Sequence, residues 1–149
     1  MNDLERLLQG HPFVEGMDPD HVRLLVACAR NLRFRSGEYL MRAGEHEDAL
    51  YLIRQGSVGI ELARPGAETL VLETVGPGDI LGVSLFTSVP AHLDCRARET
   101  VLAMALDNRC LLHNMETDPR LGYALAKRLL LHTYERLSRA RLQHLDVYR

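Results

Sequence analysis

Histidine and arginine are the side chains in this sequence that could carry chemistry. The seven histidines are spread along the chain, and no two stand close enough in one predicted strand to hold a metal ion together. They are His11, His21, His46, His92, His113, His132 and His144. A Gly-x-Ser-x-Gly elbow, a Walker-type phosphate loop and a His-Glu-x-x-His helix are all missing from the sequence. We therefore expect no catalytic residue, no metal site and no enzyme.

Arginine supplies every basic residue except Lys127. The guanidinium group suits phosphate recognition because its planar fork can donate two parallel hydrogen bonds. A GC-rich coding sequence would produce the same bias, so the arginine content alone does not predict a phosphate site. The formal net charge of -2 also argues against a surface that attracts nucleic acid as a whole.

Short strands separated by glycine-rich turns are predicted for the middle of the chain, from Leu32 to about Leu106. The turn signals recur about every ten residues, which is typical of an all-β barrel or roll. They are Ser36-Gly37, Ala43-Gly44, Gln55-Gly56, Pro65-Gly66 and Gly76-Pro77-Gly78. Runs such as Ala49–Ile53 do not alternate with polar residues, so we expect strands covered on both faces.

Helices are predicted on both sides of this region. Asp18-Pro19 and Asp118-Pro119 each supply an N-cap followed by a proline in the first turn. The last helix runs without a breaker from residue 118 to about Val147, and its residues Tyr123, Leu130, Leu137 and His144 recur at intervals of seven. Such a seam predicts a homodimer through this helix, which at about 43 Å is longer than one small roll needs.

Composition and length predict one soluble domain over residues 1–149. We divide it into N-terminal helices (1–30), a β-roll (31–106) and C-terminal helices (107–149). No apolar run could span a membrane, and the first residues do not resemble a signal peptide. Cys28, Cys95 and Cys110 are odd in number and have no Cys-x-x-Cys spacing, which favours free thiols in the cytoplasm over a disulfide framework or zinc site.

The order of elements and turns resembles the cyclic nucleotide-binding domain of the bacterial catabolite activator and its relatives, over roughly residues 18 to 147. The resemblance is carried by Gly44-Glu45 with Asp48–Ile53, by Gln55–Val58 and by Gly76–Gly82. It is closest to short bacterial members that lack a helix-turn-helix, which share Leu81–Ser84, Leu121–Tyr123 and Leu145–Tyr148. The implied fold is a mostly β, α+β jelly-roll-like β-roll (a double-stranded β-helix) with N-terminal helices and a long C-terminal helix, and we expect no DNA-binding domain.

The resemblance places a ligand pocket near residues 78–97. In the family, a glutamate beside the glycine that starts a short helix takes the ribose hydroxyl, and an arginine further along pairs with the cyclic phosphate. Here Gly82 is that glycine, but Val83 stands at the glutamate position and Ala91 at the arginine position. The hydroxyl neighbour falls at His92. Loss of both anchors predicts much weaker binding of a cyclic nucleotide such as cAMP or cGMP.

The implied site therefore consists of Gly82, Val83, Ser84, Leu85, Ala91, His92, Arg96 and Ala97. Arg96 is a candidate replacement anchor, although strand alternation would point it to the opposite side from Ala91. We interpret the chain as a cyclic-nucleotide-binding-like regulatory or sensor domain with an altered or degenerate pocket. A ligand-free module for dimerisation or for a protein partner is the first alternative, and a cupin-type metal enzyme is a weaker one.

Overall fold

Two short helices begin the chain, and each starts at a capping residue. The computed structural model describes residues 2–147. In α1 (Asp3–Gln9), the Asn2 side chain accepts a hydrogen bond from the Glu5 N–H at 2.7 Å. In α2 (Pro19–Val26), the Asp18 carboxylate accepts from the Asp20 N–H at 2.8 Å and a proline opens the helix, as the sequence predicts. A single 3₁₀ turn, η1 (Pro12–Val14), joins the two helices.

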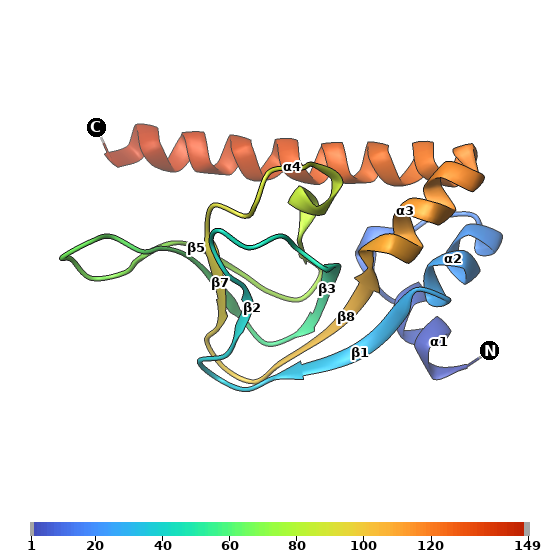
Figure 1. Ribbon diagram of the computed structural model, residues 1–149, viewed down its shortest axis with the longest axis horizontal. Helices are drawn as coiled ribbons and strands as arrows, with labels where there is room; N and C mark the ends of the chain where they lie inside the picture. The colour runs from blue at the N-terminus through green and yellow to red at the C-terminus, as the bar shows by residue number, and fades with distance from the viewer. Residues whose placement is uncertain (1, 148–149) are drawn as a thin grey trace. The chain divides into compact units, whose positions relative to one another are not determined.

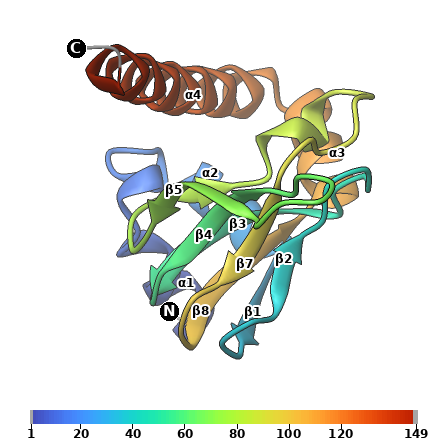
Figure 2. The same cartoon turned by 90° about the vertical axis from the view of Figure 1, so that its left-hand side faces the viewer.

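Two four-stranded antiparallel sheets form the middle of the chain (Figures 1 and 2). One sheet has the order β1-β8-β3-β6 and the other β2-β7-β4-β5. The strands are β1 (Ala29–Phe34), β2 (Tyr39–Met41), β3 (Ala49–Gln55), β4 (Val58–Leu62), β5 (Leu70–Val75), β6 (Ile80–Leu81), β7 (Asp94–Ala97) and β8 (Val101–Asp107). The predicted β-roll is confirmed, and its strands end at the predicted turns.

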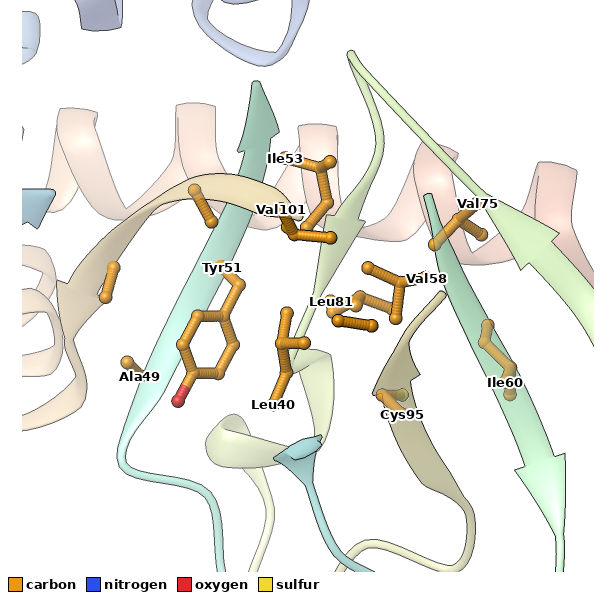
Figure 3. Close-up of a cluster of buried hydrophobic side chains, with 13 residues drawn as sticks. Leu40, Ala49, Tyr51, Ile53, Val58, Ile60, Val75, Leu81, Cys95 and Val101 are labelled. Atoms are coloured by element: carbon orange, nitrogen blue, oxygen red, sulfur yellow. The ribbon is translucent and has the colours of Figure 1, made fainter. Parts of the chain in front are cut away.

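The inward faces of the two sheets share one hydrophobic core (Figure 3). Side chains from both sheets meet there, among them Leu40, Tyr51, Val58, Leu81 and Cys95. Strand β3 is buried at five consecutive positions, Ala49–Ile53. Alternate side chains belong to the core between the sheets, and Leu50 and Leu52, which point to the opposite face of their sheet, are also 0% exposed. This confirms the expectation of strands covered on both faces.

The C-terminal helices follow the roll. Helix α3 (Asn108–Thr117) comes first and lies within the segment 107–149 for which C-terminal helices are predicted. Helix α4 (Pro119–Val147) is 29 residues long and is capped by Asp118, whose carboxylate accepts from the Arg120 and Leu121 N–H groups at 3.2 Å each. The chain divides within α3 into two compact units, Met1–His113 and Asn114–Arg149.

Part of the predicted helix seam lies outside the described residues. This applies to the side chains of His144, Asp146 and Val147, and to Tyr148 altogether. Within the second unit, Gly122 allows a tight turn between the helices, because an added Cβ would lie 2.6 Å from the Met115 carbonyl oxygen. None of the helices described in residues 2–147 is long and apolar enough to cross a membrane.

The cysteine prediction is wrong for two of the three residues. Cys28, just after α2, and Cys110, in the first turn of α3, form a disulfide with a Cα–Cα distance of 5.5 Å. Cys95 is a buried thiol in β7 that takes no part in the disulfide. The pairing was missed because 82 residues separate the two cysteines, and only the fold brings them together.

Candidate functional site

The predicted pocket begins at the turn that follows β5. The Asp79 carboxylate closes this turn by accepting from the Gly76 N–H at 2.9 Å. After β6, Gly82 takes φ +104° and starts a short 3₁₀ turn, η2 (Val83–Phe86). Only glycine fits here, because an added Cβ would lie 2.5 Å from the Ala49 carbonyl oxygen. Gly82 is therefore explained by close packing of η2 on the start of β3.

The other predicted pocket residues near η2 lie in different surroundings. Val83 and Ser84 are half-buried in η2, and Leu85 continues the turn, although its side chain lies outside the described part of the chain. Ala91 is 5% exposed. Its backbone pairs with the turn between β2 and β3, because its N–H donates to the Glu45 carbonyl at 3.0 Å and its carbonyl accepts from the Gly44 N–H at 2.7 Å.

His92, the neighbour of Ala91, is exposed, whereas Ala97 belongs to the core of the roll. Ala97 is fixed by its backbone, because its N–H donates to the Glu38 carbonyl at 2.8 Å. Its methyl group contributes to packing among buried apolar side chains and offers no polar group to a ligand.

Arg96 lies between two core residues of β7, Cys95 and Ala97, so its side chain points away from the interior of the roll. There its Nε lies 3.4 Å from a carboxylate oxygen of Glu61, whose side chain is only 6% exposed. The guanidinium also lies over the Tyr39 ring, 5.5 Å from its centroid. The side chain is thus directed as strand alternation predicts and is held by groups on that outer face.

A second arginine near the pocket, Arg42, is also engaged. Its guanidinium carbon lies 3.9 Å from the centroid of the Tyr39 ring, and its Nε lies 3.7 Å from the Asp94 carboxylate. Asp94 is 9% exposed and accepts a hydrogen bond from the Ala43 N–H at 2.7 Å. Moving Arg42 toward a ligand would leave Asp94 with less compensation for its buried charge.

Glu47 is the pocket residue that sequence reasoning missed. Its Oε2 atom would lie 3.1 Å from a Cβ added to Gly82, so the carboxylate reaches the start of η2. Both Glu47 Oε2 and Ser84 Oγ are shielded from solvent, and neither makes a well-formed hydrogen bond within the described residues. Burial raises the pKa of Glu47, and the nearby Ser84 hydroxyl opposes part of that rise.

The only sequence signal for this residue was a run of acidic side chains, Glu45, Glu47 and Asp48, within a turn. That pattern does not distinguish a solvated loop from a carboxylate directed inward. A cavity of about 70 Å³ lies beside Glu47, and its wall includes Leu40 and Tyr51 of the core. Drug-sized ligands occupy cavities of about 300–1,000 Å³, so this cavity can take a single group of a ligand in the described conformation.

No group of three histidine, cysteine, aspartate or glutamate side chains is placed to hold a metal ion among the residues that the structure describes. The arrangement around η2 offers one carboxylate and one hydroxyl group in partly buried surroundings. Arg42 lines the cavity beside Glu47, but its guanidinium contacts Asp94 and the Tyr39 ring. The carboxylate accepts hydrogen bonds only, whereas the hydroxyl can donate as well as accept.

Comparison with known families places this geometry in context. The family model of the cyclic nucleotide-binding domain matches residues 31–118, which is more than half of the chain. The cyclic AMP receptor protein of Thermus thermophilus is 27% identical over 75 residues, which make up 50% of this chain and 35% of that protein. The chain therefore matches about a third of the length of this relative.

Solved structures show the same fold. A cyclic nucleotide-binding domain from Methylobacillus flagellatus superimposes with a TM-score of 0.81 at 22% identity, covering 96% of this chain and 81% of the other. The regulatory subunit of a cAMP-independent protein kinase A from Trypanosoma cruzi, bound to guanosine, gives a TM-score of 0.64 at 23% identity. That match covers 79% of this chain and 45% of the other.

Proposed function

Because the chain belongs to the cyclic nucleotide-binding domain family, we propose that it is a regulatory domain whose pocket has lost its preference for a cyclic phosphate. The observation that carries this proposal is that the arginine lining the cavity, Arg42, is already engaged by Asp94 and the Tyr39 ring. Val83 and Ala91 stand at the two anchor positions, and Arg96 is directed to the outer face beside Glu61. A buried phosphate would lack charge-assisted hydrogen bonds worth about 1.5–3 kcal/mol each.

The proposed ligand is less charged than a cyclic nucleotide. The kinase regulatory subunit from Trypanosoma cruzi is described as cAMP-independent and as bound to guanosine, a nucleoside without phosphate. This supports the idea that a roll of this fold can be used with an uncharged ligand. Guanosine is therefore the first uncharged probe to compare with cAMP and cGMP.

Isothermal titration calorimetry of the purified protein with cAMP, cGMP and guanosine tests the proposal. We expect no binding of either cyclic nucleotide at micromolar concentrations and tighter binding of the nucleoside. Binding of cAMP at micromolar strength would contradict the proposal. An Arg96→Ala or Arg98→Ala variant would then identify an arginine that has moved into the pocket.

The second candidate function is a ligand-free interaction module. The apolar side chains of Val83 and Ala91 favour it, because they make the pocket less polar than a phosphate site. The same titration separates the two functions. If neither cyclic nucleotide nor guanosine produces heat or thermal stabilisation at millimolar concentration, the interaction module becomes the better account.

We further propose that α4 pairs with α4 of a second copy of the chain. The residues Tyr123, Leu130 and Leu137 are 68%, 69% and 47% exposed and recur every seven positions. A sustained seven-residue spacing of large side chains is typical of helices that pack against each other along a seam. Such a dimer would couple the ligand pockets of two rolls through the paired α4 helices.

A further inference from the structure

Glu47 reaches the start of η2 with its carboxylate, in the part of the roll where a ligand's polar group would be held. We infer that Glu47 determines the ligand specificity of this pocket, and that its carboxylate rejects a phosphate and accepts hydroxyl or amino donors of an uncharged ligand. This inference rests on the proposed function and assigns its ligand preference to one side chain.

The position of Glu47 is fixed by its backbone and neighbours. The Asn108 side-chain amide donates to the Glu47 carbonyl at 3.1 Å, and the Asn108 N–H donates to the Asp48 carbonyl at 2.9 Å. These bonds tie the loop before β3 to the first residue of α3. On the other side, the close approach of Gly82 to the Ala49 carbonyl holds η2 against the same loop.

The hydrogen-bonding state of the two side chains gives the direction of the preference. Glu47 Oε2 and Ser84 Oγ are both shielded from solvent without a well-formed hydrogen bond in the described chain. A buried carboxylate oxygen gains free energy when a donor reaches it and loses free energy when another acceptor is forced against it, whereas a serine hydroxyl can donate or accept. The direction of the preference therefore comes from Glu47. A hydroxyl or amino group supplies donors, whereas a phosphate diester supplies only acceptors and a negative charge.

The carboxylate of Glu47 forms no ion pair among the described residues, although Arg42 lines the same cavity. The Arg42 guanidinium instead contacts Asp94 and the Tyr39 ring. A cyclic phosphate entering beside Gly82 would therefore meet a like charge in partly buried surroundings. Repulsion between like charges is stronger there than in bulk water.

The inference is tested by an NMR titration of the ¹⁵N-labelled protein that follows the Gly82 and Ser84 amides. Wild type, Glu47→Gln and Glu45→Gln are each titrated with cAMP and with guanosine up to millimolar concentrations. Glu47→Gln removes one charge at nearly constant volume. Glu45→Gln is the matched control, because it removes the same charge from an exposed side chain of the same turn. Glu47→Ala repeats the test with a second side chain and checks that the result does not depend on glutamine.

We expect Glu47→Gln to bind cAMP at least about tenfold more tightly than wild type does, with guanosine binding unchanged or weakened. Glu45→Gln should match wild type. Equal cAMP affinities of wild type and Glu47→Gln, including no detectable binding by either, would overturn the inference and leave the proposed function standing. An equal gain in Glu45→Gln would also overturn it. Tight cAMP binding by wild type would instead refute the proposed function, and the affinity ratio between the variants would still decide the role of Glu47.

Discussion

Gly82 shows how a single residue fixes the geometry of the pocket. It combines φ +104° with a position where an added Cβ would lie 2.5 Å from the Ala49 carbonyl. We predict that Gly82→Ala lowers the free energy of unfolding by about 3 kcal/mol or more, because backbone strain and a steric clash add. Gly66→Ala is the control, since Gly66 also has positive φ (+68°) but faces open space, and it should cost about 1 kcal/mol. Urea denaturation of both variants measures the difference, and equal losses would contradict the packing role.

A buried histidine makes stability depend on pH. His11 is 4% exposed, its Nε2 lies 3.0 Å from the Ile53 carbonyl oxygen, and its Nδ1 accepts from the Phe13 N–H. Burial lowers the pKa of His11 below its ordinary value of 6.5, although the Ile53 carbonyl and Asp79 oppose this. The unfolded chain therefore binds a proton that the folded chain binds less readily. Stability from this residue is complete above pH 6.5 and declines as the pH falls below it.

We predict that the free energy of unfolding of wild type falls relative to that of His11→Gln as the pH is lowered from 6.5, by at most about 1.4 kcal/mol per pH unit. Glu47 acts in the opposite direction, because its raised pKa means that stability falls as the pH rises above its ordinary value of 4.5. The comparison with His11→Gln removes this contribution, since Glu47 is present in both proteins. Parallel pH profiles of the two proteins would show that His11 titrates normally.

Some pocket residues could be placed from the sequence and others could not. The turn spacing located Gly82, and the assignment of Ala91 to the position of a missing anchor stays a prediction. Strand alternation correctly directed Arg96 away from the core. Glu47 could not be found in this way, because a side chain in an irregular turn has no periodicity that indicates its direction.

Among the secondary-structure elements, the Cys28–Cys110 disulfide joins the end of α2 to the start of α3. It closes a loop with a sequence separation of 82, for which chain entropy predicts about 4.5 kcal/mol of stabilisation, although measured values are commonly about 2–5 kcal/mol. We predict that a reductant lowers the free energy of unfolding of wild type by about 3–4 kcal/mol. Cys28→Ser/Cys110→Ser should be equally destabilised and insensitive to the reductant.

Cys95→Ala provides the control for this measurement, because Cys95 takes no part in the disulfide and the variant should keep its response to reductant. Three reactive thiols in the protein as purified without reductant would contradict the disulfide. The cytoplasmic location stays a prediction, and the thiol count bears on it, because disulfides persist mainly in oxidising compartments.

The elements themselves were more predictable than the contacts between them. Helix starts followed from Asp18-Pro19 and Asp118-Pro119, because capping depends on adjacent residues. The roll followed from the spacing of its turns. The strand order β1-β8-β3-β6 did not, since pairing between strands distant in sequence leaves no local signal. The disulfide was missed for the same reason.

At the scale of the whole molecule, the assignment of residues 1–149 to one domain stays a prediction. The core shared by the two sheets lies within the first compact unit, Met1–His113, while α4 belongs to the second. A helix of 29 residues with several exposed apolar side chains is unusual in a monomer, because large exposed apolar patches mark interaction surfaces. This is the reason to test self-association.

We predict that Leu130→Glu/Leu137→Glu converts a dimer of the wild type into a monomer, since two carboxylates on each helix would face each other across the proposed seam. Sedimentation velocity over a range of protein concentrations measures the change. The matched control is Arg136→Gln/Arg139→Gln, which changes the net charge by the same amount. Arg139 lies about 200° around the helix from Leu137. A monomeric wild type would refute pairing through α4, and a dimer that persists in the leucine variant would place the interface elsewhere on the chain.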